Sequence, residues 1–417
     1  MNTSLTKYRY RLLAIFLLAL AVRLAWIALN YTADFSAFQD GDYTLYAIGG
    51  EHILQQGDFS NSLFLVRPPL FPLIIAALDL NTGAVLIFNA LVGALAAPLT
   101  AMFAGRVGLA PRWAAAAGIL VAIDPPGIVY SAYLGPEAIA NTLLLLVLWI
   151  LWTGIDADKH KIGLGIASGL LLVLAAYARP ASYLLWIPLG IGIFVFFRKQ
   201  KRLAVAFMLC SALGIGAWTA HNGLVFETPA FSTIGVYNLL YYRAASVQRM
   251  ATGQPIDDVY VDLSARVEEL LGRDPSAADT GTRHEHYAAA GQTQNAMQAV
   301  ALDVFKSYPL AYAAGIPIGL ARFLIVLNGM SGWAEVIVML WNLVFLALAA
   351  VGIEVARRAR NYRFAGLSLL LTAYFIVGTL AVQTSGIDTR ARTMLTPIMA
   401  LAAAFALSAF KNRRWLK

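Results

Sequence analysis

Three carboxylates and a histidine lie close together directly after the first strongly apolar segment of the chain. The stretch FQDGDYTLYAIGGEHIL, residues 38–54, contains Asp40, Asp42, Glu51 and His52. A carboxylate in this position can remove a proton from a hydroxyl group or help to hold a divalent metal ion. The structural alternative is a solvated acidic loop that takes no part in chemistry.

Arginines next to prolines, or close before one, mark the ends of three other apolar segments. Arg67 lies in VRPPLFP, Arg179 in YARPASY, and Arg390 with Arg392 in DTRARTMLTP. A guanidinium at the membrane edge can bind two phosphate oxygens at once, because its N–H groups form a planar fork. The alternatives are snorkelling of the side chain to the headgroups and, for the last pair, salt bridges to external acids.

Two more polar stretches lie at the ends of apolar segments. DPPGIVYSAYLGPEA carries Asp124 and Glu137, and Glu137 follows a proline at an expected helix start. A carboxylate there also interacts favourably with the helix dipole, so a purely structural role competes with a chemical one. WTAHNGLVF places His221 and Asn222 where another segment ends. A single histidine at such a place is more often a hydrogen-bonded interface residue than a catalyst.

Several common catalytic signatures are absent from the sequence. RHEHY holds His284 and His286, but no other His or Cys is nearby, which does not favour a zinc site. The chain has no HExxH, no P-loop and no G-x-S-x-G, so an ATP-driven pump is unsupported. The single cysteine, Cys210, excludes an intramolecular disulfide.

The elements that must position these residues are long apolar segments. The 417 residues are 59% hydrophobic and 13% charged, whereas a soluble domain carries roughly a quarter charged residues. Apolar runs long enough to cross a bilayer recur along the whole chain. The sequence therefore predicts an all-α polytopic membrane protein, and not an outer-membrane barrel with its short alternating segments.

The hydropathy pattern predicts about ten membrane-spanning helices. The expected spans are 12–30, 83–104, 113–130, 137–153, 162–178, 182–197, 203–221, 334–355, 364–382 and 394–410. The apolar segment 308–328 contains Pro317 and Arg322 and is expected to be an interfacial or re-entrant helix. If it crossed the membrane, the basic stretch RRARNYR at 357–363 would face outward.

The basic residues predict the orientation of these spans. Of the 31 Lys and Arg residues, 19 gather in six short stretches, at 7–11, 106–112, 159–161, 198–202, 357–363 and 411–417. The positive-inside rule places these stretches, and with them both termini, in the cytoplasm. The segments between the other span ends are acidic or mixed and are expected outside.

The domain organisation follows from this topology. We expect an N-terminal transmembrane module over 1–221, whose first outer loop at 31–82 carries the catalytic residues. An external lobe of two or three helices, together with the interfacial helix, covers 222–333, and further transmembrane helices cover 334–417.

The order of these motifs resembles the GT-C membrane glycosyltransferases. The shared features are an acidic first outer loop, the R-P-P-L-F-P turn, Pro-Glu before one span, Arg-Pro after another and R-x-R before the last span. The sequence looks most similar to the bacterial branch related to protein O-mannosyltransferases and to the aminoarabinose transferase of lipid A. The similarity covers most of the chain in order and is weakest over 240–330.

The resemblance implies a role for several residues. The family's catalytic aspartate lies in a D-x-x-x-Y-A pattern, which here is DYTLYA, so Asp42 is expected to be the general base. Asp40 is the second candidate, and Tyr46 is the tyrosine of the pattern. Arg67 matches the basic residue that binds the carrier phosphate in the aminoarabinose branch, but Leu45 replaces an arginine of that branch, which argues against that sugar.

The last two motifs depart from those of the relatives. WTAHN replaces W-T-x-R-N, and RARTM replaces R-Y-R-x-P. Arg390 and Arg392 remain candidates for binding the donor phosphate. Glu137, Arg179, His221 and Asn222 remain further candidates for the site.

The function that the resemblance implies is transfer of one sugar from a polyprenyl-phosphate donor to an acceptor hydroxyl. The acceptor is a glycan, a lipid or a protein, and no nucleic-acid partner is expected. A divalent metal is a possible cofactor, and whether the reaction needs one stays open. The expected location is a bacterial inner membrane with the active site in the periplasm. A flippase, or a polymerase or ligase of polyprenyl-linked surface glycans, is the alternative.

Overall fold

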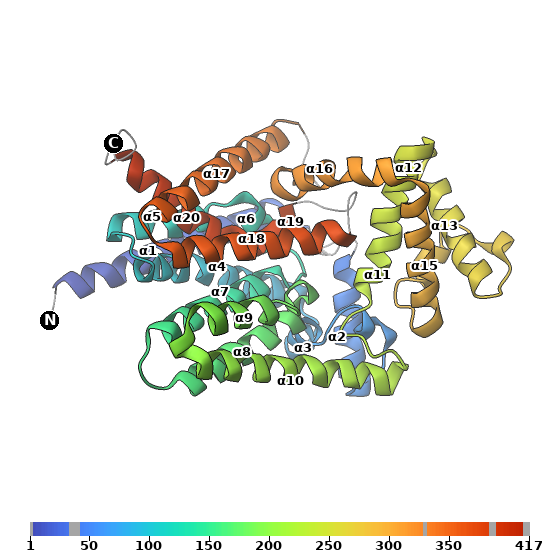
Figure 1. Cartoon of the computed structure of the whole chain (residues 1–417), viewed down its shortest axis with the longest axis horizontal. Helices are drawn as coiled ribbons and strands as arrows, with labels where there is room; N and C mark the ends of the chain where they lie inside the picture. The colour runs from blue at the N-terminus through green and yellow to red at the C-terminus, as the bar shows by residue number, and fades with distance from the viewer. Residues whose placement is uncertain (1–2, 33–41, 328–331, 383–388, 412–417) are drawn as a thin grey trace.

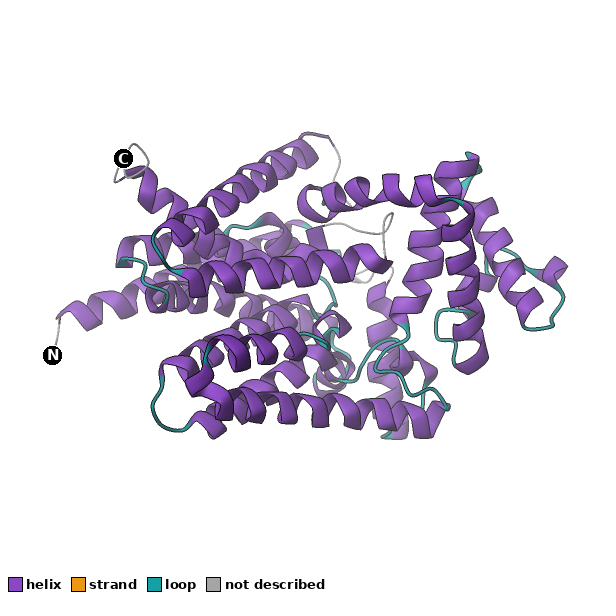
Figure 2. Ribbon diagram, in the orientation of Figure 1, coloured by secondary structure: helices purple, strands orange, loops and turns teal. Residues whose placement is uncertain are grey.

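The computed structural model describes residues 3–32, 42–327, 332–382 and 389–411. Within these parts of the chain the regular structure is entirely helical, and no strand occurs (Figure 2). The predicted all-α class is confirmed.

Eight helical segments of the described chain are long and apolar enough to cross a membrane. Their main helices are α1 (Thr3–Leu29), α4 (Thr82–Arg106), α7 (Glu137–Asp156), α8 (Lys161–Ala178), α10 (Lys201–Phe226), α17 (Gly332–Arg358), α18 (Tyr362–Val382) and α20 (Thr396–Lys411). They correspond to eight of the ten expected spans.

The other two expected spans are shorter helices. Segment 113–130 is divided into α5 (Pro111–Ala122) and α6 (Pro125–Tyr130), because the side chain of Asp124 accepts a hydrogen bond from the Gly127 N–H and caps α6. The 12 residues of α5 rise about 18 Å along the helix axis, which is less than the hydrocarbon thickness of about 30 Å.

Segment 182–197 forms only α9 (Trp186–Phe196). Pro180 follows Arg179, which has an extended backbone conformation, and residues 180–185 form turns before α9 begins.

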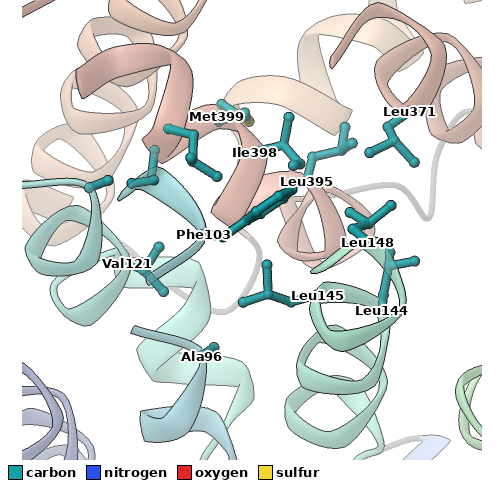
Figure 3. Packing of buried hydrophobic residues seen from close by; sticks show 14 of the residues in the cluster. Ala96, Phe103, Val121, Leu144, Leu145, Leu148, Leu371, Leu395, Ile398 and Met399 are labelled. Atoms are coloured by element: carbon teal, nitrogen blue, oxygen red, sulfur yellow. The ribbon is translucent and has the colours of Figure 1, made fainter. Parts of the chain in front are cut away.

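The bundle core forms around α20. Of the eight segments, the one that contains α20 is the most buried: 83% of its most apolar stretch lies inside the protein. The corresponding share for α18 is only 22%. Phe103 of α4 lies among Leu145, Leu148 and Leu395 in this core (Figure 3). Helices α17 and α20 pack so closely that a Cβ at Gly352 would lie 1.7 Å from the Ala402 carbonyl oxygen.

The basic stretches gather at one end of the bundle. The Arg363 guanidinium donates to Asp156 at 2.6 Å, and Asn361 donates to the Val107 carbonyl at 2.8 Å, which brings three of the cytoplasm-assigned connections together. Figure 1 shows both ends of the chain at this same end, opposite the lobe. The arrangement agrees with the predicted common side, and the direction across the membrane stays a prediction.

The segment that was predicted to be external folds into more helices than expected. They are α11 (Ile234–Asn238), a π-helix (Leu239–Ala244), α12 (Ala245–Thr252), α13 (Ile256–Leu270), α14 (Thr282–Glu285) and α15 (Gly291–Ser307). These helices form the lobe at the far end of the bundle (Figure 1). The lobe has its own core, in which Tyr241, Leu263 and Met297 are fully or almost fully buried.

Helix α16 (Pro309–Ile325) connects the lobe to α17. The chain bends by 102° between α15 and α16, and Pro309 occupies the first turn of α16. Figure 1 shows α16 running back toward the bundle in roughly the direction of α18. Its end is held where Asn342 of α17 donates to the Ile325 carbonyl at 2.8 Å. Its position relative to a bilayer stays a prediction.

Candidate active site

A cavity of about 470 Å³ lies between the bundle and the lobe. Its walls come from α2 (Asp42–Gln56), the chain before α3 (Leu70–Ala77), the turn between α8 and α9, the lobe, α18 and α19 (Thr389–Arg392). Three arginines line it, namely Arg67, Arg179 and Arg390. No acidic residue occurs among the described residues that line it, so its charged groups are suited to an anion.

Arg67 is positioned by a tight local fold. A short 3₁₀ turn precedes it, the Arg67 N–H donates to the Leu63 carbonyl at 2.8 Å, and two prolines follow before α3 begins. Its guanidinium lies 5.2 Å from the ring centre of Tyr46 and 5.7 Å from that of Tyr287, and the residue is only 8% exposed. These cation–π contacts hold Arg67 between the bundle and the lobe.

A buried carboxylate organises the other two cavity arginines. Glu137 is the first residue of α7, as predicted, and is 1% exposed. Its Oε1 accepts a hydrogen bond from Arg390 Nε at 2.6 Å and lies 4.0 Å from Arg179 Nη1. Arg179 also donates to the Arg390 carbonyl at 3.2 Å. Glu137 does not line the cavity but fixes two cations that do.

Arg392 lies in a different environment from Arg390. It is fully buried, donates to Asn342 Oδ1 at 2.8 Å and lies 3.5 Å from Asp124 Oδ1. Asp124 Oδ2 also accepts a hydrogen bond from Thr396 at 3.0 Å. In this arrangement Arg392 does not line the cavity, and its role in binding the donor phosphate stays a prediction. Residues two apart on a helix face away from each other, so the R-x-R pair is divided between cavity and core.

His221 and Asn222 support the chain after α10. The His221 ring stacks on Trp218 with 4.6 Å between ring centres, and Asn222 is fully buried and donates to the Ala230 carbonyl at 2.8 Å. Neither residue lines the cavity. In this arrangement their contacts support the chain after α10, and a role of either residue in the site stays a prediction.

Of the two candidate bases, the structure describes only the backbone of Asp42. Asp40 lies outside the described residues. Asp42 is the first residue of α2, but its side chain lies outside the description. Tyr46 follows one helical turn later, is 1% exposed and lines the cavity. The catalytic roles of Asp42 and Asp40 stay predictions.

The described residues contain no group of three or more His, Cys, Asp or Glu that could hold a metal ion. A requirement for metal stays untested, because Asp34, Asp40 and the side chain of Asp42, all in the first loop, are not described. His286 of the RHEHY stretch is buried and bonded to Glu268 at 2.7 Å and to Tyr241 at 2.5 Å. Burial opposes ionisation of Glu268, but hydrogen bonds from His286 and Arg273 outweigh it and lower the Glu268 pKa.

Sequence reasoning missed the aromatic wall of the cavity. Tyr183, Tyr242, Tyr287, Tyr374 and the amide of Asn238 all line it. Two of these tyrosines, Tyr183 and Tyr287, end the stretches YARPASY and RHEHY, in which the arginine and the histidines are the more conspicuous residues. No local sequence pattern marks the lobe residues as part of the cavity. They reach it only because the lobe packs against the bundle, which is a tertiary contact.

Comparison with known proteins identifies the fold. The chain matches no protein-family model and no curated protein sequence. It is similar to solved structures of the Archaeoglobus fulgidus oligosaccharyltransferase, among them the apo form and a form tethered to an acceptor peptide with the NVT sequon. A third is the archaeal oligosaccharyltransferase AglB with an inhibitory peptide and a dolichol-phosphate.

These likenesses extend over the whole chain at low sequence identity. The identity is 14%, the TM-scores are 0.56 to 0.57, and the alignments cover 98% of this chain. The chain spans about half the length of each of the solved proteins. The protein therefore has a GT-C-like polytopic membrane fold.

Proposed function

We propose that the protein is a glycosyltransferase that moves a single sugar from a polyprenyl-phosphate donor to an acceptor hydroxyl. The observation that carries this proposal is the convergence of Arg67, Arg179 and Arg390 on one cavity at the lobe end of the bundle. A lipid phosphate leaving the sugar develops negative charge, and preorganised cations lower the barrier by stabilising it.

The proposed chemistry is a single displacement at the sugar's anomeric carbon. Asp42 accepts the proton of the acceptor hydroxyl, the acceptor oxygen bonds to the anomeric carbon, and the bond to the phosphate oxygen breaks. Attack opposite the phosphate inverts that carbon. The position of Asp42 one helical turn before Tyr46, a cavity residue, supports this role. The donor bond supplies the free energy, so no nucleotide is needed.

The similarity of fold supports a lipid-linked donor. One of the similar structures contains a dolichol-phosphate, and another carries an acceptor peptide. We propose that this chain takes a polyprenyl phosphate as carrier and a glycan, lipid or protein as acceptor. The bacterial branch named above and an active site on the periplasmic side of the inner membrane belong to this proposal.

A flippase for polyprenyl-linked glycans is the alternative of another class. Transporters of known folds place their sites near mid-membrane between related halves, often with broken helices. The cationic cavity here lies instead toward the lobe, at one end of the bundle. A polymerase or ligase would use the same cavity but transfer a preassembled chain, and the mass of the added unit separates it from the proposed enzyme.

The test is sugar transfer in membrane vesicles with labelled polyprenyl-phosphate sugars, comparing wild type with Asp42→Asn. We expect the wild type to move label to a new product and the variant to lose at least about a hundredfold in rate, the lower range for a general base. Transfer at the wild-type rate by a folded, inserted variant overturns the general-base role. Movement of donor between leaflets without transfer favours the flippase.

Asp58→Asn is the matched control in the same loop. Hydrogen bonds from the Ser60 backbone and from His52 lower the pKa of Asp58 to about 2, and its side chain is 55% exposed. The same chemical change at this position removes an acid of the loop that does not line the cavity. We expect unchanged transfer, which separates the effect of Asp42 from a general loss of loop charge.

A further inference from the structure

The cavity has a charged end and an uncharged end. Its three arginines come from the chain before α3, from the α8–α9 turn and from α19. Another part of the wall consists of Tyr374, Phe375, Gly378, Thr379 and Val382, which follow one face of α18. A ligand that fills the cavity therefore meets cations at one side and an uncharged helix face at another.

The cavity reaches the surface of the protein along two uncharged segments. Among the described residues that line the cavity, three are exposed, namely Ala181, Leu184 and Gly378. The first two belong to the turn before α9 and the third to α18. Neither 180–197 nor 364–382 contains a charged residue, so the opening lies between two uncharged segments.

One hydrogen bond and one glycine define the edges of the opening. The Tyr374 hydroxyl donates to the Ala181 carbonyl at 3.0 Å and joins α18 to the α8–α9 turn. One helical turn further toward the lobe, Gly378 has open space beside it, because a Cβ added there would meet no atom within 4 Å. The surrounding surface is apolar, since Val377 is 66% exposed and Ile191 of α9 is 50% exposed.

We infer that the hydrocarbon tail of a polyprenyl phosphate leaves the cavity between Leu184 and Gly378 and enters the bilayer there. This inference rests on the proposed function and adds the route of the lipid. An amphiphile whose headgroup binds arginines must keep its tail in an apolar environment, because each methylene exposed to water costs about 0.8 kcal/mol. The opening between Leu184 and Gly378 leads from the arginines to the apolar flank of α9 and α18, and the absence of a side chain at Gly378 keeps it wide.

The test is to close the opening with a side chain. Gly378→Trp adds a large ring where the structure has space, whereas Gly378→Ala adds only one methyl group and favours the helix. Gly366 offers a matched control, because it lies on the same helix, is exposed and also has no atom within 4 Å of an added Cβ. Gly366→Trp therefore makes the same change away from the cavity.

The measurement is binding to the purified full-length protein of two probes, a long-chain polyprenyl phosphate and a one-unit prenyl phosphate. We expect Gly378→Trp to weaken the long-chain probe about tenfold or more, since losing contact with even two methylenes costs that much. The one-unit probe fits within the cavity and should bind as to wild type. Gly378→Ala and Gly366→Trp should leave both affinities unchanged.

Several outcomes overturn the inference. Unchanged binding of the long-chain probe to folded Gly378→Trp means that the tail takes another route. Equal weakening of both probes means that the tryptophan blocks the cavity itself. Equal affinity of the wild type for phosphatidic acid means that the site takes any lipid phosphate. Loss of transfer in Asp42→Asn with a normal chain-length effect at Gly378 supports route and function separately.

Discussion

Arg390 and Arg392 lie two residues apart in the same short helix, yet they occupy opposite kinds of environment. Arg390 lines the cavity and its Nε donates to Glu137 at 2.6 Å. Arg392 is fully buried in the bundle and contacts Asn342, Asp124 and the sulfur of Met399. The same residue type thus lines the cavity at one position and joins helices of the bundle at the other.

The difference shows that the surroundings of a charged residue, and not its type, decide its role. Asp124 caps α6 and accepts hydrogen bonds from α17 and α20, so the buried pair connects several helices of the core. The three arginines of the cavity come from segments that are far apart in the sequence and converge only at the cavity. The partners of Arg392 lie inside the bundle, whereas the three cavity arginines also border the space that a ligand would fill.

The largest effect should come from breaking the buried pair. Arg392→Ala removes one of the two buried arginines that interact with the fully buried Asp124, the other being Arg23. Breaking a buried pair of this kind costs about 3–5 kcal/mol. We expect a large drop in the thermal unfolding temperature and in the yield of folded protein. Arg392→Met combined with Asp124→Leu removes both charges and should recover part of the loss. A normal unfolding temperature together with weakened donor binding would restore the phosphate role to Arg392.

Arg67→Ala should act on the donor and little on stability. Hydrogen bonds between charged groups contribute about 1.5–3 kcal/mol, so the KM for the lipid donor should rise roughly ten- to hundredfold. The KM for the acceptor should stay the same. Arg67→Lys keeps the charge but loses the planar fork and should recover only part of the affinity. A larger change in acceptor KM than in donor KM would contradict the assignment.

The fold could be predicted because hydropathy and charge act over whole segments. Long uncharged runs give spans, and the basic connections gather at one end, as contacts such as Arg363–Asp156 illustrate. The prediction was wrong where single residues decide the outcome. Asp124 caps a new helix within 113–130, and Pro180 delays the start of α9, so neither segment forms one long continuous helix.

The site could be predicted only in its local parts. Arg67 and Arg179 lie next to prolines at the ends of apolar segments, which marked them as fixed cations. The pairing of Arg392 with Asp124 joins positions 268 residues apart, and no local pattern announces it. The lobe tyrosines Tyr242 and Tyr287 reach the cavity only because the lobe packs against the bundle.

Glu137 is buried like Arg392 but contacts arginines of the cavity. Its variant should show a smaller effect than Arg392→Ala or Arg67→Ala. Glu137→Gln keeps the shape of the side chain but removes the charge that orients Arg390 and lies 4.0 Å from Arg179. Because both arginines also reach the cavity, water can solvate them, and the loss of stability should be smaller than for Arg392→Ala.

The kinetic signature separates this positioning role from direct binding. Less well oriented arginines should lower kcat about threefold to tenfold, since they stabilise charge that develops only in the transition state. The donor KM should stay the same or fall, because a negative charge beside an anion site has been removed. Glu137→Asp, which keeps the charge on a shorter side chain, should retain more of kcat than Glu137→Gln. A rise in donor KM with unchanged kcat would instead mean that Glu137 contributes to ground-state binding of the donor. The cavity arginines would then differ from the buried pair only in their contribution to donor affinity.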